Sequence, residues 1–81
     1  MMNYEEILKR VIKLLETMKE PENEVTADSE LIEDLGVSSM DLVFLVTSLE
    51  EEFEIKVPVS VIRKMYTVTD VAEIVDELIS E

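Results

Sequence analysis

Three stretches of this chain repeat apolar side chains at helical spacing, and this feature limits its possible folds more than any other. The spacing predicts helices over residues 3–18, 39–53 and 68–79, because side chains three and four positions apart share one helix face. A shorter helix is predicted over 59–64. We therefore expect an all-α fold, a four-helix bundle of three main helices plus one short helix. The side chains expected to face the core are Ile7, Val11, Leu14 and Met18, then Leu42, Leu45, Val46, Leu49 and Phe53, then Val71, Ile74, Val75, Leu78 and Ile79.

Residues that begin or end helices stand at the borders of these stretches. Asn3 is a suitable N-cap for the first helix, and Pro21 is expected to end it. Pro58 precedes the short helix, and either Thr67 or Thr69 is expected to cap the last one. The helix borders are thus predicted by residues with a physical reason to be there.

The long connection over residues 19–37 has no sustained period. A structureless loop of this length is unusual in a compact domain, so we expect it to be held on the core, with a short helical turn near 28–34. Residues 55–57 have the composition of a strand, but no other segment offers them a partner. The apolar residues expected to hold the connection on the core are Leu31, Ile32, Leu35 and Val37.

The composition argues against an enzyme. A chain of 81 residues makes one small domain, residues 1–81, with a thin core. It has no histidine and no cysteine, so it lacks the side chain most used for proton transfer near neutral pH and any thiolate nucleophile. We expect a protein that binds or carries rather than one that catalyses.

The net charge of −13 limits the partners. Twelve acids and no base lie between Glu20 and Glu54. This field repels nucleic acid and anionic lipid and attracts basic protein surfaces. No stretch reaches the roughly 20 apolar residues that span a bilayer, and the first residues do not resemble a signal peptide. We expect a cytoplasmic monomer without nucleic-acid partners or membrane insertion.

The sequence DLGVSSMD, residues 34–41, contains the only glycine of the chain. Gly36 can take positive φ and turn the chain sharply before the helix. Ser38 with Asp41 three positions on has the spacing of a capping box, which would leave the hydroxyl of Ser39 free and pointing outward. A phosphate ester there would face the positive end of the helix dipole. On spacing alone, an ordinary capped helix also accounts for both serines.

Three runs together resemble the acyl carrier proteins. DLGVSSMDLV at 34–43 is similar to their attachment motif Asp-Leu-Gly-x-Asp-Ser-Leu, and LEEEFEIKVP at 49–58 is similar to their Leu-Glu-Glu-Glu-Phe…Ile-Pro run. TVTD at 67–70 matches their Thr-Val-x-Asp. The resemblance extends over nearly the whole chain without gaps. It implies a four-helix bundle that carries 4′-phosphopantetheine on Ser39.

The resemblance also implies the partners. A CoA-dependent phosphopantetheinyl transferase would install the arm, and acyl-transferring or synthase enzymes with basic docking patches would then act on the cargo. The arm would bring the thiol that this chain lacks. The alternatives are a carrier for amino acids or D-alanine, and an acidic helical adaptor that is never pantetheinylated.

The chain departs from the family pattern beside the motif. Ser38 stands where Asp is usual, Met40 where Leu is usual, and Phe44 where fatty-acid carriers usually have Glu. The segment 59–64, usually acidic, is apolar and then basic. Met40 and Phe44 lie four positions apart off the core stripe, so they form either an exposed docking pair or a half-buried rim of the core. These departures favour a specialised carrier in a lipid or polyketide-like pathway. We assign its partner surface to Met40, Asp41, Phe44, Glu50 and Glu51.

The acidic clusters have two further interpretations. Glu50, Glu51 and Glu52 crowd the C-terminal turn of the 39–53 helix, where the dipole disfavours acids, and this indicates a function at that surface. The acids that begin at Asp28 superficially resemble a calcium loop. The loop has Glu33 where an EF-hand needs Gly, and its twelfth residue is Ser rather than Glu, so we predict no specific metal site. Loose binding of divalent cations that relieves the repulsion among the acids, without a catalytic role, is left as an alternative.

Overall fold

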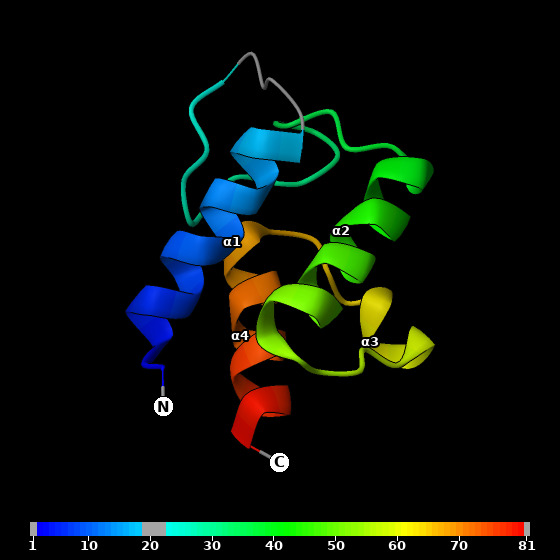
Figure 1. Cartoon of the computed structure of the whole chain (residues 1–81). Helices are drawn as coiled ribbons and strands as arrows, with labels where there is room; N and C mark the ends of the chain where they lie inside the picture. The colour runs from blue at the N-terminus through cyan, green and yellow to red at the C-terminus, as the bar shows by residue number, and fades with distance from the viewer. Residues whose placement is uncertain (1, 19–22, 81) are drawn as a thin grey trace.

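Four helices form the framework of the computed structural model, which describes residues 2–18 and 23–80. They are α1 (Tyr4–Met18), α2 (Ser39–Phe53), α3 (Val59–Ile62) and α4 (Val68–Ser80). The predicted all-α fold of three main helices and one short helix is confirmed. The bounds of α2 are those predicted, whereas α3 ends two residues early, with Arg63 as its C-cap. Figure 1 shows both ends of the chain at one end of the molecule and the start of α2 at the other.

Helix α1 begins as predicted. The Asn3 Oδ1 atom accepts a hydrogen bond from the Glu6 backbone N–H at 2.9 Å, which caps the first turn. The buried face of α1 is rotated slightly from the predicted one. Leu15 is buried with Ile7 and Val11, whereas Leu14, which was predicted to face the core, is only half-buried. The predicted role of Pro21 lies outside the described residues.

Helix α4 is capped reciprocally by Thr67 and Asp70. The Asp70 N–H donates to Thr67 Oγ1 at 3.1 Å, and the Thr67 N–H donates to Asp70 Oδ2 at 2.9 Å. Thr69, the other candidate cap, instead donates its hydroxyl to the Ala27 carbonyl at 2.8 Å. It thereby ties α4 to the long connection.

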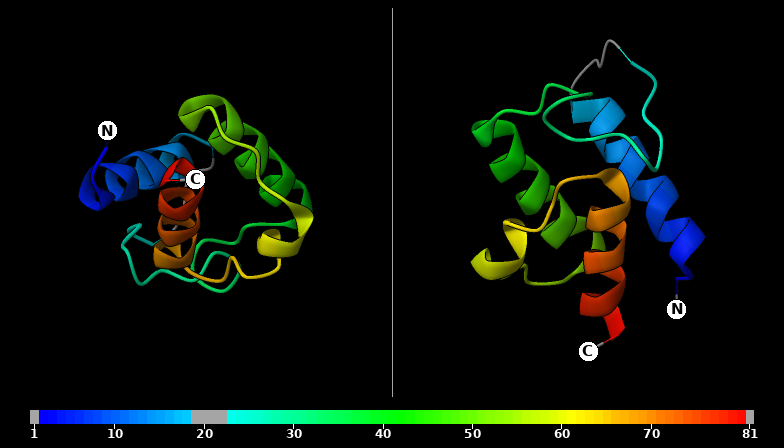
Figure 2. Two further views of the ribbon diagram at one scale, coloured as in Figure 1. Left: turned by 90° about the horizontal axis from the view of Figure 1, so that it is seen from below. Right: turned by 180° about the vertical axis from the view of Figure 1, so that it is seen from behind.

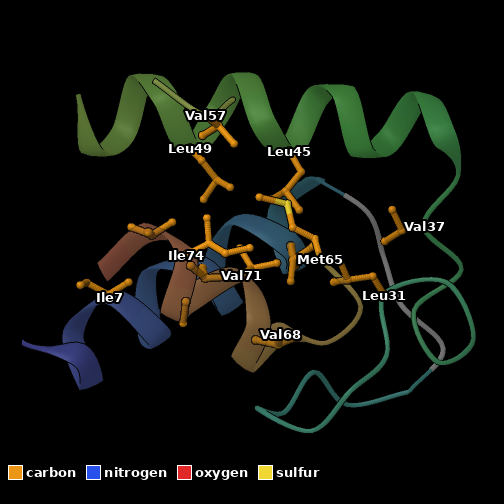
Figure 3. Packing of buried hydrophobic residues seen from close by; sticks show 14 of the residues in the cluster. Ile7, Leu31, Val37, Leu45, Leu49, Val57, Met65, Val68, Val71 and Ile74 are labelled. Carbon is orange, nitrogen blue, oxygen red and sulfur yellow. The ribbon is translucent and has the colours of Figure 1, made fainter. Parts of the chain in front are cut away.

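The core lies between α1, α2 and α4, and the connections close it (Figure 3). From the long connection, Leu31, Leu35 and Val37 are buried as predicted, but the prediction for Ile32 is wrong, since 69% of it is exposed. The residues around it form a tight turn, in which the Gly36 N–H donates to the Ile32 carbonyl at 3.1 Å. In this turn Leu31 and Leu35, four positions apart, face the core, and Ile32 lies among exposed residues between them. The other buried apolar residues are Ile7, Val11, Leu15, Val25, Leu45, Leu49, Phe53, Val57, Met65, Val68, Val71, Ala72, Ile74 and Val75.

Backbone hydrogen bonds join the long connection to the segment before α4. The Leu31 N–H donates to the Tyr66 carbonyl at 2.9 Å, and the Val68 N–H donates to the Ser29 carbonyl at 3.0 Å. Between them is an isolated antiparallel bridge, Glu30 with Thr67. The predicted short helical turn near 28–34 is confirmed by a helix-type hydrogen bond from the Asp34 N–H to the Glu30 carbonyl at 3.0 Å. Residues 55–57 pair with no strand in the described chain.

Figure 2 shows that α3 lies beside α2 rather than within the bundle. The connection that leads to α3 leaves α2 at Glu54, which takes the left-handed conformation with φ 53° and donates its N–H to the Glu50 carbonyl. None of the four residues of α3 is fully buried. Helix α3 is therefore a cover on one side of α2.

Candidate functional site at the start of helix α2

The turn before α2 depends on Gly36. Its φ of 65° lies in the left-handed region, where a residue without a Cβ atom pays no steric penalty. The next residue, Val37, is buried and donates its N–H to the Leu31 carbonyl at 2.9 Å. The glycine therefore reverses the chain so that Val37 anchors in the core and the following residues emerge at the surface.

Ser38 is the N-cap of α2, and its hydroxyl is committed to that role. Ser38 Oγ accepts from the Asp41 N–H at 3.1 Å, and the Ser38 N–H donates to Asp41 Oδ2 at 2.9 Å. The predicted capping box is confirmed, although its usual last residue is Glu or Gln. The box fixes where α2 begins, and so fixes Ser39 as its first helical residue.

Ser39 is exposed at the first position of α2. Within residues 2–18 and 23–80 its hydroxyl has no hydrogen-bond partner, in contrast to that of Ser38. The unpaired N–H groups and the positive end of the dipole of α2 are at this position, and they favour a phosphate ester. A reachable hydroxyl at a helix N-terminus fits the attachment of a phosphate-linked arm.

A mainly apolar pocket of about 190 Å³ opens beside Ser39, between α2 and α3. The hydroxyl of Thr47, its only other side-chain polar group, donates to the Val43 carbonyl at 3.0 Å and so is satisfied locally. Sequence reasoning did not find this pocket, because it depends on where α3 lies. Its lining residues are Ser39, Leu42, Val43, Val46, Thr47 and Ile62.

The outward face of α2 is apolar in its first turns. Met40 is 73% exposed and Phe44 60% exposed, which confirms the exposed pair and excludes the half-buried rim. Val43 on α2 and Val59 on α3 are also exposed, and neither was singled out from the sequence. The exposure of Val43 could have been predicted from helical geometry, because Val43 lies outside the core-facing stripe of Leu42, Leu45 and Leu49.

Two of the three acids at the end of α2 have structural partners. Glu50 Oε2 accepts from the Val57 backbone N–H at 2.9 Å, and Glu52 Oε2 pairs with the Arg10 guanidinium at 2.7 Å. Glu51 is exposed. The cluster of acids at the end of α2 was interpreted as a sign of function, but two of its members have a structural role. Glu50 joins α2 to the connection that follows it, and Glu52 joins α2 to α1.

In the part of the chain that the structure describes, no group of three or more acids is arranged to hold a metal ion. No helix among the same residues combines the length and apolar character needed to cross a membrane.

A family model described as a phosphopantetheine attachment site matches residues 5–78. The chain belongs to this phosphopantetheine carrier family. Proteins named acyl carrier protein from Campylobacter fetus subsp. fetus and Campylobacter jejuni are each 44% identical to it over 54 residues, which is 67% of this chain and 70% of theirs. A third, from Campylobacter concisus, is 43% identical over the same length. The carrier uses 4′-phosphopantetheine as its prosthetic group and is not itself a catalyst.

Proposed function

We propose that Ser39 is the attachment residue and that the chain carries acyl groups as thioesters on the arm. The observation that supports this most is the division between the two serines. Ser38 uses its hydroxyl to cap α2, whereas the hydroxyl of Ser39 is exposed and unpaired among the described residues. A phosphopantetheinyl transferase needs a hydroxyl that can reach its active site, and Ser39 provides one.

The chemistry of the arm complements this chain. The bound group supplies the thiol that forms the thioester, and the chain has no cysteine of its own. The chain contributes the phosphate ester oxygen of Ser39, the dipole of α2 at that phosphate, and a framework that holds both. No proton-transfer residue is required of it, in agreement with a protein that contains no histidine.

An aliphatic cargo is favoured over an amino acid. The pocket beside Ser39 is lined mainly by apolar side chains, and a charged ammonium group in it would lose hydration without gaining a partner. A fatty chain can place methylene groups there and keep them from water. We infer that the pocket is where the cargo is sheltered.

The docking surface lies on α2. The apolar pair Met40 and Phe44 supplies the anchors, because exposed methionine and aromatic side chains are enriched at interfaces. We expect the protein to act as one carrier domain, residues 1–81, and as a monomer in a specialised pathway. The docking residues proposed are Met40, Asp41, Phe44, Glu50 and Glu51.

The decisive experiment is an intact mass of the apo-protein after incubation with CoA and a broad-specificity phosphopantetheinyl transferase. We expect the wild type and Ser38→Ala to gain one arm and Ser39→Ala to gain none. No gain in the wild type would overturn the carrier proposal and favour an adaptor. A gain that persists in Ser39→Ala and is lost in Ser38→Ala would move the attachment to Ser38.

A further inference from the structure

The segment 55–69 has a charge opposite to that of the rest of the chain. It contains no acid, and it holds three of the seven bases of a protein with a net charge of −13. These three, Lys56, Arg63 and Lys64, are all exposed. The single ion pair among the described residues joins Arg10 to Glu52, so none of the three is neutralised by a neighbour. The segment that contains α3 therefore carries a local positive charge, from Lys56 before the helix and from Arg63 and Lys64 directly after it.

The neighbouring surface of α2 is apolar and has little charge of its own. Met40, Val43 and Phe44 are exposed there, and Val59 is exposed on α3. Val43 and, from α3, Ile62 line the same pocket, so the two helices adjoin beside Val43. We call the surface formed by Met40, Val43, Phe44, Val59, Arg63 and Lys64 the α2–α3 face.

The acids of α2 differ in how freely they can turn toward a partner. Asp41 accepts from the Ser38 N–H, and Glu50 accepts from the Val57 N–H, so each of these half-buried carboxylates has an oxygen bound to the backbone of its own chain. Both keep their negative charge, and Glu51 is exposed. Among its own six residues the α2–α3 face has two bases and no acid, on an otherwise acidic protein.

We propose that the α2–α3 face docks onto a partner enzyme whose complementary surface is apolar opposite α2 and acidic opposite α3. This rests on the proposed carrier function and specifies the partner. Apolar anchors supply affinity, and the charges of Arg63 and Lys64 select among partners, because like charges across an interface are costly. A partner with a continuous basic patch is rejected at α3. An anionic membrane is disfavoured as the occupant because the net charge of −13 repels it.

The test uses a fatty-acid synthase whose own carrier has been removed and whose enzymes have basic docking patches. Intact mass first confirms that each carrier variant is loaded, so failure of loading counts against the carrier function and not against the docking proposal. Elongation is then measured with the wild type and with Arg63→Glu/Lys64→Glu. We expect the charge-reversed variant to raise kcat/KM by roughly tenfold, through faster association at low salt. Equal elongation by both would overturn the proposal.

A matched control separates the face from overall charge. Lys9→Glu/Lys13→Glu changes the net charge by the same amount at two exposed positions on α1. We expect no gain from it, and an equal gain would assign the effect to net charge and overturn the proposal. The converse test replaces two basic docking residues of the synthase with Glu. The wild-type carrier should then outperform Arg63→Glu/Lys64→Glu, and the opposite order would also overturn it.

A membrane is tested as the competing occupant. The loaded protein is co-sedimented with phosphatidylglycerol vesicles at low salt, beside Arg63→Glu/Lys64→Glu and Phe44→Glu. We expect no sedimentation of any of them. Sedimentation of the wild type that both substitutions abolish would reassign the α2–α3 face to a lipid surface.

Discussion

Ser38 and Asp41 hold each other by two hydrogen bonds, the Ser38 N–H to Asp41 Oδ2 at 2.9 Å and the Asp41 N–H to Ser38 Oγ at 3.1 Å. The pair fixes the first turn of α2 and leaves Ser39 as the serine without a structural role. The box uses Ser and Asp where Ser or Thr with Glu is commoner, so the shorter carboxylate reaches the N-cap backbone directly. The start of the helix and the reachable hydroxyl are thus set by the same contact.

Replacing Ser38 with Ala should lower the free energy of unfolding without preventing attachment of the phosphopantetheine arm. The substitution removes the side-chain cap, and the loss of such a cap costs about 1 kcal/mol of unfolding free energy. Urea denaturation followed by circular dichroism measures this. Ser38→Asp, which restores a capping side chain, is the control and should recover the stability. A Ser38→Ala protein as stable as the wild type would contradict the capping role.

Glu50 and Glu51 should respond differently to replacement by Ala. Glu50→Ala leaves the Val57 N–H without its carboxylate partner at a part-buried position, and such a loss costs about 1–3 kcal/mol. Glu51→Ala removes an exposed side chain and should change stability by no more than about 0.5 kcal/mol. Urea denaturation of both variants, side by side, gives the comparison. Equal losses would show that the Glu50 contact contributes nothing to the fold.

Salt should stabilise this protein. The twenty acids outnumber the seven bases, so repulsion among the acids exceeds the attraction between acids and bases. The structure shows one ion pair among the described residues to offset this repulsion. Raising the salt from 0.01 M to 1 M shortens the Debye length from about 30 Å to about 3 Å and screens that repulsion. Exposed ion pairs contribute only about 0–1 kcal/mol, so the repulsion dominates. We expect Tm to rise steadily with sodium chloride in thermal scans, and a fall would show that the ion pair matters more.

Leu45→Ala should come close to unfolding the protein. Leu45 is fully buried in α2, and truncating such a side chain typically costs about 2–5 kcal/mol. A core this small supplies about 3–5 kcal/mol in total. Met40→Ala, on the exposed side of the same helix, is the control and should leave the urea midpoint nearly unchanged. Similar midpoints for the two variants would contradict the assignment of the inner and outer faces.

The sequence predicted best where one local rule acts alone. The bounds of α2, the capping box at Ser38 and the turn at Gly36 follow from helical periodicity and backbone preference within a few residues. The exposure of Met40 and Phe44 follows from the same projection of the helix. These are also the features that define the candidate site, which is why so much of it was predictable.

Prediction was weaker where distant segments decide the outcome. Ile32 is exposed in a turn that the Leu31 N–H joins to the carbonyl of Tyr66, a residue far along the chain. The end of α2 was interpreted as functional because its dipole disfavours acids, but Arg10 and the Val57 N–H provide partners that no local rule identifies. The pocket beside Ser39 depends in the same way on the placement of α3.

The N- and C-terminal ends of the chain lie at one end of the molecule, and α2 begins with Ser39 at the other (Figure 1). A tag, a surface linker or a fused protein attached at either end would therefore be directed away from the serine. Immobilised through residue 80, the carrier would present the start of α2, with Ser39, to the solution. The same molecule can thus be used on a sensor chip to compare enzymes that must reach this serine.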